Sequence, residues 1–139
     1  MKKVLIVDDD MVFQKTMTDK LKEKGYEVIS AMDGEEGLKQ ATTSNPDIML
    51  LDIKMPKMDG ISLLRQLRKN DDMPKMPILI TSNMTGTENI ADGISLGVRG
   101  YIIKSNETLD TIVREVEAVL NPDVKVESVV RQADPSPNK

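Results

Sequence analysis

Residues 4–10 read VLIVDDD, four aliphatic residues followed at once by three acids. Three further apolar runs also end at a polar side chain: residues 48–51 at Asp52, residues 78–80 at Thr81 and Ser82, and residues 101–103 at Lys104. Ligands of open α/β sheets bind beyond the carboxyl ends of the strands. We therefore expect these acids, hydroxyls and the amine to converge on one pocket that has the parts of a phosphoryl-transfer site.

The remaining sequence alternates between strand and helix patterns. The short runs rich in Val, Ile and Leu, with a further strand at residues 27–31, are typical of strands buried on both faces of a parallel sheet. Apolar residues at helical spacing predict five helices, over about residues 10–24, 35–44, 61–67, 87–97 and 109–120. This alternation indicates an α/β fold with right-handed crossovers.

Composition narrows the function classes. The 139 residues carry a net charge of −4, no basic cluster and 2% aromatic residues, so we expect no nucleic-acid binding. The chain has neither Cys nor His, which excludes thiolate and imidazole chemistry in this chain. No run resembles a signal peptide or spans a bilayer, so we expect no membrane contact and a cytoplasmic protein. Residues 1–120 suit one domain, and the polar, proline-containing residues 121–139 are expected to form a mobile tail.

Four segments together resemble the receiver domain of two-component response regulators: VLIVDDD (4–10), LLDIKMPKMDG (50–60), PILITSN (77–83) and RGYIIKS (99–105). The resemblance covers about residues 3–120, and residues 88–101 are similar to stand-alone chemotaxis-type regulators. It implies a flavodoxin-like (βα)5 three-layer sandwich with a parallel five-stranded sheet of order 2-1-3-4-5.

The resemblance also implies roles for the acids at the strand ends. Asp52 would accept a phosphoryl group. Asp9 would bind Mg²⁺ directly and Asp8 through water, with Asp52 and the backbone carbonyl of Lys54 completing the protein ligands. Mg²⁺ suits such a site because it binds one or two carboxylates and keeps positions for water and phosphate.

The same resemblance assigns the remaining site residues and the partners. Ser82 would move onto the phosphoryl group, Lys104 would pair with it, and Tyr101 would be the aromatic switch residue. The donor would be a sensor histidine kinase or a histidine phosphotransfer protein. A downstream protein would bind the face made by the fourth helix, the fifth strand and the fifth helix. Such a protein is a signalling switch that assists its own phosphorylation and dephosphorylation, not a turnover enzyme.

The proposed chemistry is also reasonable from the residues themselves. A carboxylate attacking phosphorus makes a reactive acyl phosphate. Negative charge spreads over the oxygens of the transferring group, so positioned cations do most of the catalysis. Lys104 supplies a compact cation and Ser82 a hydrogen-bond donor.

Several single residues have plainer interpretations. Asp10 is better explained as the N-cap of the first helix. Thr81 competes with Ser82 for the hydroxyl role, and counting from Pro77 favours Ser82. Tyr101 is alternatively a packing residue.

Other function classes stay open beside the switch. The main alternative is a receiver-shaped interaction module that takes no phosphate. A flavodoxin-like cofactor binder needs a phosphate loop where three acids stand, and an aspartate-nucleophile phosphatase would carry its nucleophile after the first strand.

Two residues depart from the family pattern. Ser105 stands where the family usually has Pro, so we expect a trans peptide and a shifted loop. Asn83 stands where a small residue is usual, so we expect tighter access to the phosphoryl group.

Overall fold

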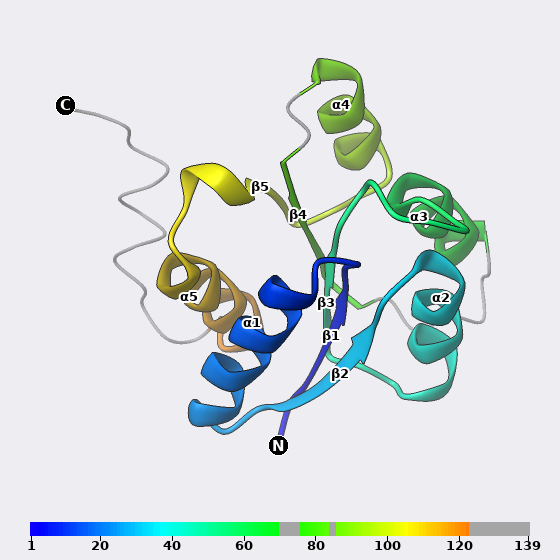
Figure 1. Ribbon diagram of the computed structural model, residues 1–139. Helices are drawn as coiled ribbons and strands as arrows, with labels where there is room; N and C mark the ends of the chain where they lie inside the picture. The colour runs from blue at the N-terminus through cyan, green and yellow to red at the C-terminus, as the bar shows by residue number, and fades with distance from the viewer. Residues whose placement is uncertain (70–75, 84–85, 123–139) are drawn as a thin grey trace, which may run out of the picture.

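The structure is a computed structural model that describes residues 1–69, 76–83 and 86–122 (Figure 1). Strands and helices alternate along the chain as predicted. The strands are β1 (Lys3–Val7), β2 (Glu27–Ala31), β3 (Ile48–Leu51), β4 (Ile78–Ser82) and β5 (Gly100–Ile103). The α-helices are α1 (Met11–Glu23), α2 (Gly34–Thr43), α3 (Gly60–Lys69), α4 (Thr87–Ser95) and α5 (Leu109–Leu120).

The five strands form one parallel sheet in the order β2-β1-β3-β4-β5, which confirms the expected fold. A helix connects each strand to the next one along the chain, because parallel strands cannot be joined by a tight turn. In this order β3 is the central strand between β1 and β4, and β2 and β5 are the edge strands.

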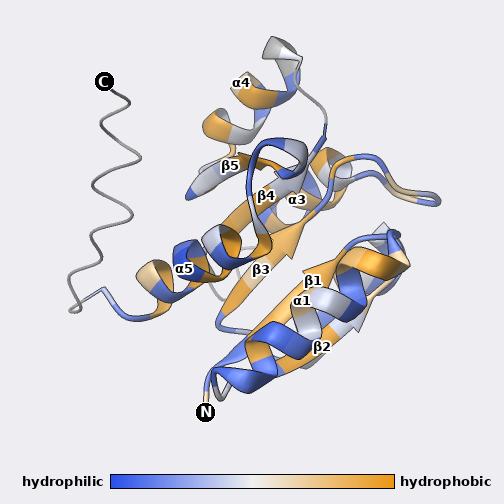
Figure 2. Ribbon diagram, turned by 60° about the vertical axis from the view of Figure 1, so that its left-hand side comes forward, coloured by the Kyte–Doolittle hydropathy of each residue, from blue (hydrophilic) through white to orange (hydrophobic). Residues whose placement is uncertain are grey.

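Alternate residues of the strands point to opposite faces of the sheet and build two cores. Val4 and Ile6 of β1 belong to a core with α1 and α5, whereas Leu5 and Val7 belong to a core with α2 and α3. Figure 2 shows the central strands coloured as hydrophobic and the helices with mixed colouring. This is expected when each helix packs one apolar side against the sheet and turns its polar side to solvent. Helix α4 contacts α3 and β5.

Local signals set the helix ends. The side chain of Asp10 accepts hydrogen bonds from the backbone N–H groups of Val12 and Phe13, so its interpretation as the N-cap of α1 is confirmed. Gly25 has a φ of +92°, the left-handed conformation that follows the end of α1.

The loop after β5 is a short 3-10 helix, η1 (Lys104–Asn106). The described residues contain no cis peptide bond, as expected for Ser105 in place of Pro. Among the helices of the described residues, none has the length and apolar character needed to cross a membrane. Residues 123–139 of the expected tail lie outside the described residues, so its mobility stays a prediction.

Candidate functional site

The register of the sheet brings the polar strand ends together. Val7 of β1 pairs with Leu51 of β3, so Asp8 and Asp52 leave adjacent strands at the same level. Ser82 at the end of β4 pairs with Ile103 of β5, so Lys104 follows directly beside it. Because all five strands are parallel, these ends meet at one edge of the sheet.

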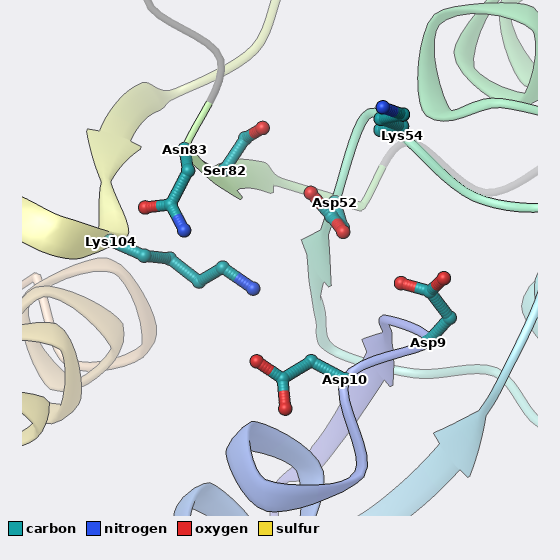
Figure 3. Close-up of a pocket in the computed structure, with 7 residues that line it drawn as sticks. All are labelled: Asp9, Asp10, Asp52, Lys54, Ser82, Asn83 and Lys104. Atoms are coloured by element: carbon teal, nitrogen blue, oxygen red, sulfur yellow. The ribbon is translucent and has the colours of Figure 1, made fainter.

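A pocket of about 360 Å³ opens at this edge. Figure 3 shows its lining side chains, which come from the ends of four strands and from the loops that follow them: Asp9, Asp10, Asp52, Lys54, Ser82, Asn83 and Lys104. Asp9 and the side chain of Lys104 approach the pocket from different sides, with Asp52 between them (Figure 3). The structure therefore places five of the expected site residues around one cavity, namely Asp9, Asp52, Lys54, Ser82 and Lys104. The expected residues Asp8 and Tyr101 are not among the lining residues.

Three carboxylates form the acidic side of this site. One oxygen each from Asp8, Asp9 and Asp52 lies within 4.8 Å of the others. Asp8 is fully buried and Asp52 is almost so, whereas Asp9 is exposed to solvent. Hard divalent cations take carboxylate oxygens, and Mg²⁺ keeps part of its water shell, so two buried acids and one solvent-facing acid fit this ion.

Electrostatics supports the fit. Burial, reinforced by the negative charge of Asp8, raises the pKa of Asp52 from 3.8 to about 6, although Lys104, the Ile53 N–H and Ser82 act in the opposite direction. Burial also raises the pKa of Asp8, despite its hydrogen bond from Lys104. Buried carboxylates in one site repel each other, and a bound cation relieves this cost.

Lys104 is held by two groups. Its Nζ donates to Oδ2 of Asp8 over 2.9 Å, and it lies 4.4 Å from the centre of the Phe13 ring. An ammonium over an aromatic face is attracted by the ring quadrupole. The sequence pattern identified Phe13 only as an apolar residue of a helix, because nothing in helical spacing tells which ring faces a cation.

Ser82 and Tyr101 interact across the β4–β5 edge. Burial raises the pKa of Tyr101, hydrogen bonding with Ser82 lowers it, and the charge of Asp52 raises it further. Ser82 is buried and lines the pocket. Thr81 is also buried, but its hydroxyl finds no hydrogen-bond partner among the described residues and is not part of the pocket lining.

Gln14 is a further residue that the sequence pattern did not single out. Its buried Nε2 lies 2.9–3.0 Å from the backbone carbonyl oxygens of Ile6, Asp8 and Ala31. This amide ties α1 to the ends of β1 and β2 and so fixes the turn that carries Asp8 and Asp9. An amide on the apolar side of a helix was the only available signal, and alone it is weak.

Comparison with known families gives one match over most of the chain. Residues 4–117 match the model of the response regulator receiver domain. The alkaline phosphatase synthesis transcriptional regulatory protein PhoP of Bacillus subtilis is 40% identical over 103 residues, which are 74% of this chain and 42% of that protein. The transcriptional regulatory protein PrrA of Mycobacterium tuberculosis is 35% identical over 118 residues, 85% of this chain and 49% of that protein. This chain therefore spans about half the length of these curated relatives.

Solved structures agree with this match. The receiver domain of the Francisella response regulator 1452 superimposes with a TM-score of 0.79 at 33% identity, covering 89% of this chain and 100% of that one. The chemotaxis protein CheY4 of Vibrio cholerae gives 0.77 at 31% identity, with coverages of 86% and 99%. A CheY-like receiver domain protein of Methanospirillum hungatei gives 0.81 at 29% identity, with coverages of 88% and 95%.

Proposed function

This chain belongs to the response regulator receiver family, and from that membership we propose that it is a phosphorylation-dependent switch whose phosphoryl acceptor is Asp52. The observation that carries the proposal is the position of the Asp52 carboxylate in an open pocket, between two further acids and Lys104. A surface acid with a purely structural role would need neither the two neighbouring acids nor Lys104.

Asp8, Asp9, Asp52 and the backbone carbonyl of Lys54 are the groups that would hold Mg²⁺. When bound, the ion would supply positive charge that offsets the negative charge of the phosphoryl oxygens. Asp9 would offer the solvent-facing ligand, since it is the exposed member of the cluster. Asp8 also holds Lys104, so one buried carboxylate positions both the metal side and the lysine side of the pocket.

The phosphoryl group would come from a phosphohistidine of a sensor kinase or a phosphotransfer protein. A carboxylate oxygen of Asp52 forms the new bond to phosphorus, and the bond from phosphorus to the imidazole nitrogen breaks. The electron pair of that bond stays on the nitrogen. Lys104 and Ser82 balance the charge on the phosphoryl oxygens.

Phosphorylation would then change partner binding. Ser82 is the residue that contacts both Asp52 and Tyr101, as the causes of their pKa shifts indicate. A phosphoryl group on Asp52 competes for the Ser82 hydroxyl and favours a second arrangement of Tyr101 at the edge strand. The face of α4, β5 and α5 would thereby change its affinity for a downstream protein, as a shift between two populated states.

Exposure to acetyl phosphate with Mg²⁺, followed by intact mass measurement, tests this function. The wild-type chain should gain one phosphoryl group and Asp52→Asn none. Asp19→Asn is the matched control, because Asp19 is an exposed acid of α1 that pairs with the exposed Lys15. A wild-type chain that gains no mass would support the alternative of an interaction module that takes no phosphate.

A further inference from the structure

Asn83 and Ser105, the two residues that depart from the family pattern, are joined by a hydrogen bond. The backbone N–H of Ser105 donates to Oδ1 of Asn83 over 2.9 Å. The bond joins the end of β4 to η1, the loop that begins with Lys104. Proline has no backbone N–H, so a proline at position 105 could not make this bond.

This bond fixes the orientation of the Asn83 amide. Only the oxygen of an amide accepts a hydrogen bond from an N–H, so the oxygen must face Ser105 and the NH₂ group must face the other way. Figure 3 shows the Asn83 nitrogen turned toward the side chain of Lys104 and its oxygen turned toward the loop after β5. Asn83 lines the same pocket as Asp52 and follows Ser82 directly.

An oriented amide in this place has a clear use. The pocket is lined by three acids, so an arriving phosphoryl group meets negative charge from one side. Its oxygens accept hydrogen bonds, and donors held in position before the reaction stabilise them without reorganisation. A neutral NH₂ group provides such a donor and leaves the ion pair between Lys104 and Asp8 undisturbed.

We propose that Asn83 is an anion-binding residue of the pocket, whose side-chain nitrogen, held on the Lys104 side by the bond from the N–H of Ser105, donates to an oxygen of the phosphoryl group on Asp52. The inference rests on the proposed function, since it names a further contact of the same site. It gives Asn83 a role opposite to the expectation that this side chain merely narrows access.

Two substitutions distinguish a role of Asn83 as a hydrogen-bond donor from a role in which its side chain only restricts access to the pocket. Asn83→Leu keeps the branched shape and removes the amide, whereas Asn83→Ala removes both. The measurement is the rate of phosphorylation by phosphoramidate with Mg²⁺, as a function of donor concentration and followed by intact mass. Asn106→Leu makes the same change at an exposed position of η1 outside the pocket lining and is the control.

If Asn83 is a donor, both variants should lose about 10-fold or more in the maximal rate, the effect of one hydrogen bond to a charged group. The control should match wild type. A faster Asn83→Ala, or an Asn83→Leu as fast as wild type, would overturn the inference while phosphorylation of the wild type upholds the proposed function. A wild-type chain that takes up no phosphoryl group would contradict both the role of Asn83 and the proposed function.

Amide hydrogen exchange supplies a second, independent readout. The Ser105 N–H should exchange slowly in wild type and at least several-fold faster in both Asn83 variants, because its acceptor is gone. Unchanged exchange at Ser105 would contradict the orienting bond, whatever the phosphorylation rates are. Thermal unfolding of each variant shows that the fold is retained.

Discussion

The side chain of Lys104 reaches Asp8 with an Nζ to Oδ2 distance of 2.9 Å, although their strands are not neighbours. Strands β3 and β4 lie between β1 and β5 in the sheet, so the lysine extends past the carboxyl ends of both. The pair is nearly buried, with the side chain of Lys104 12% exposed and that of Asp8 fully covered. Lys104 therefore compensates the charge of Asp8, whereas burial and the charge of Asp8 still raise the pKa of Asp52 to about 6.

The raised pKa of Asp52 predicts a pH-dependent stability. A carboxyl with a folded-state pKa of about 6, above its ordinary 3.8, holds its proton more tightly in the folded chain. The free energy of unfolding should therefore fall as the pH rises through this window, by on the order of 2–3 kcal/mol for this group. The loss is complete above the folded-state pKa and absent below the ordinary value. Asp52→Asn should consequently be more stable than wild type near neutral pH.

Urea denaturation in the presence of a chelator, at a series of pH values, measures this effect. Asp8 also has a raised pKa and titrates in the same direction, so Asp52→Asn should retain part of the pH dependence. Asp19→Asn should follow the wild-type curve. Equal stability of wild type and Asp52→Asn at neutral pH would refute the prediction.

Magnesium should stabilise the folded chain. An ion that binds the clustered carboxylates of the folded chain in preference to the unfolded chain stabilises the fold, so millimolar Mg²⁺ should raise the melting temperature by a few degrees. Asp9→Asn should lose most of the shift, because it removes the exposed acid of the cluster without disturbing a buried ion pair. Sodium chloride of matched ionic strength is the control, and an undiminished shift in Asp9→Asn would count against the metal site.

Phe13 should stabilise Lys104 through its ring. The 4.4 Å distance from Nζ to the ring centre predicts a coupling of about 0.5–1 kcal/mol. A double-mutant cycle of Phe13→Leu and Lys104→Met, measured by chemical denaturation, isolates this coupling from the loss of packing. Strictly additive free energies would show that the ring is only a core residue.

Gly60 should be intolerant of any side chain. A Cβ at this position would overlap the backbone carbonyl oxygen of Asp52 and lie 2.9 Å from Cα of Ile53. Gly60→Ala should therefore cost about 2–3 kcal/mol of stability and slow phosphorylation, because the backbone of Asp52 must move. Gly86→Ala is the matched control, since the nearest atom to its Cβ is 3.5 Å away. Equal melting temperatures of the two variants would disprove the close packing.

The sequence predicted the elements and the convergence of the polar strand ends on one pocket, for a physical reason. Unbroken aliphatic runs specify buried parallel strands, and parallel strands bring their carboxyl ends to one edge. Asp52, Ser82 and Lys104 could therefore be assigned to one pocket before any contact was known. The order of the strands came from the family resemblance, because hydrophobic patterns do not tell which strands are neighbours.

The contacts between side chains inside the site could not be predicted from the sequence. The pair of Lys104 and Asp8 depends on how far a flexible side chain extends across two other strands. The bond between Asn83 and Ser105 depends on a backbone N–H and an amide oxygen that meet only in three dimensions. The two departures from the family pattern were visible, but only their geometry showed that they belong together.

Localising the acceptor tests the central claim most directly. After reaction with acetyl phosphate and Mg²⁺, borohydride reduces an acyl phosphate and converts the acceptor aspartate to homoserine, which tandem mass spectrometry of peptides can place in the chain. The account predicts homoserine at position 52 alone, and none in a sample without the phosphodonor. Conversion at Asp9 or Asp59 instead, or none at all in the wild-type chain, would contradict it.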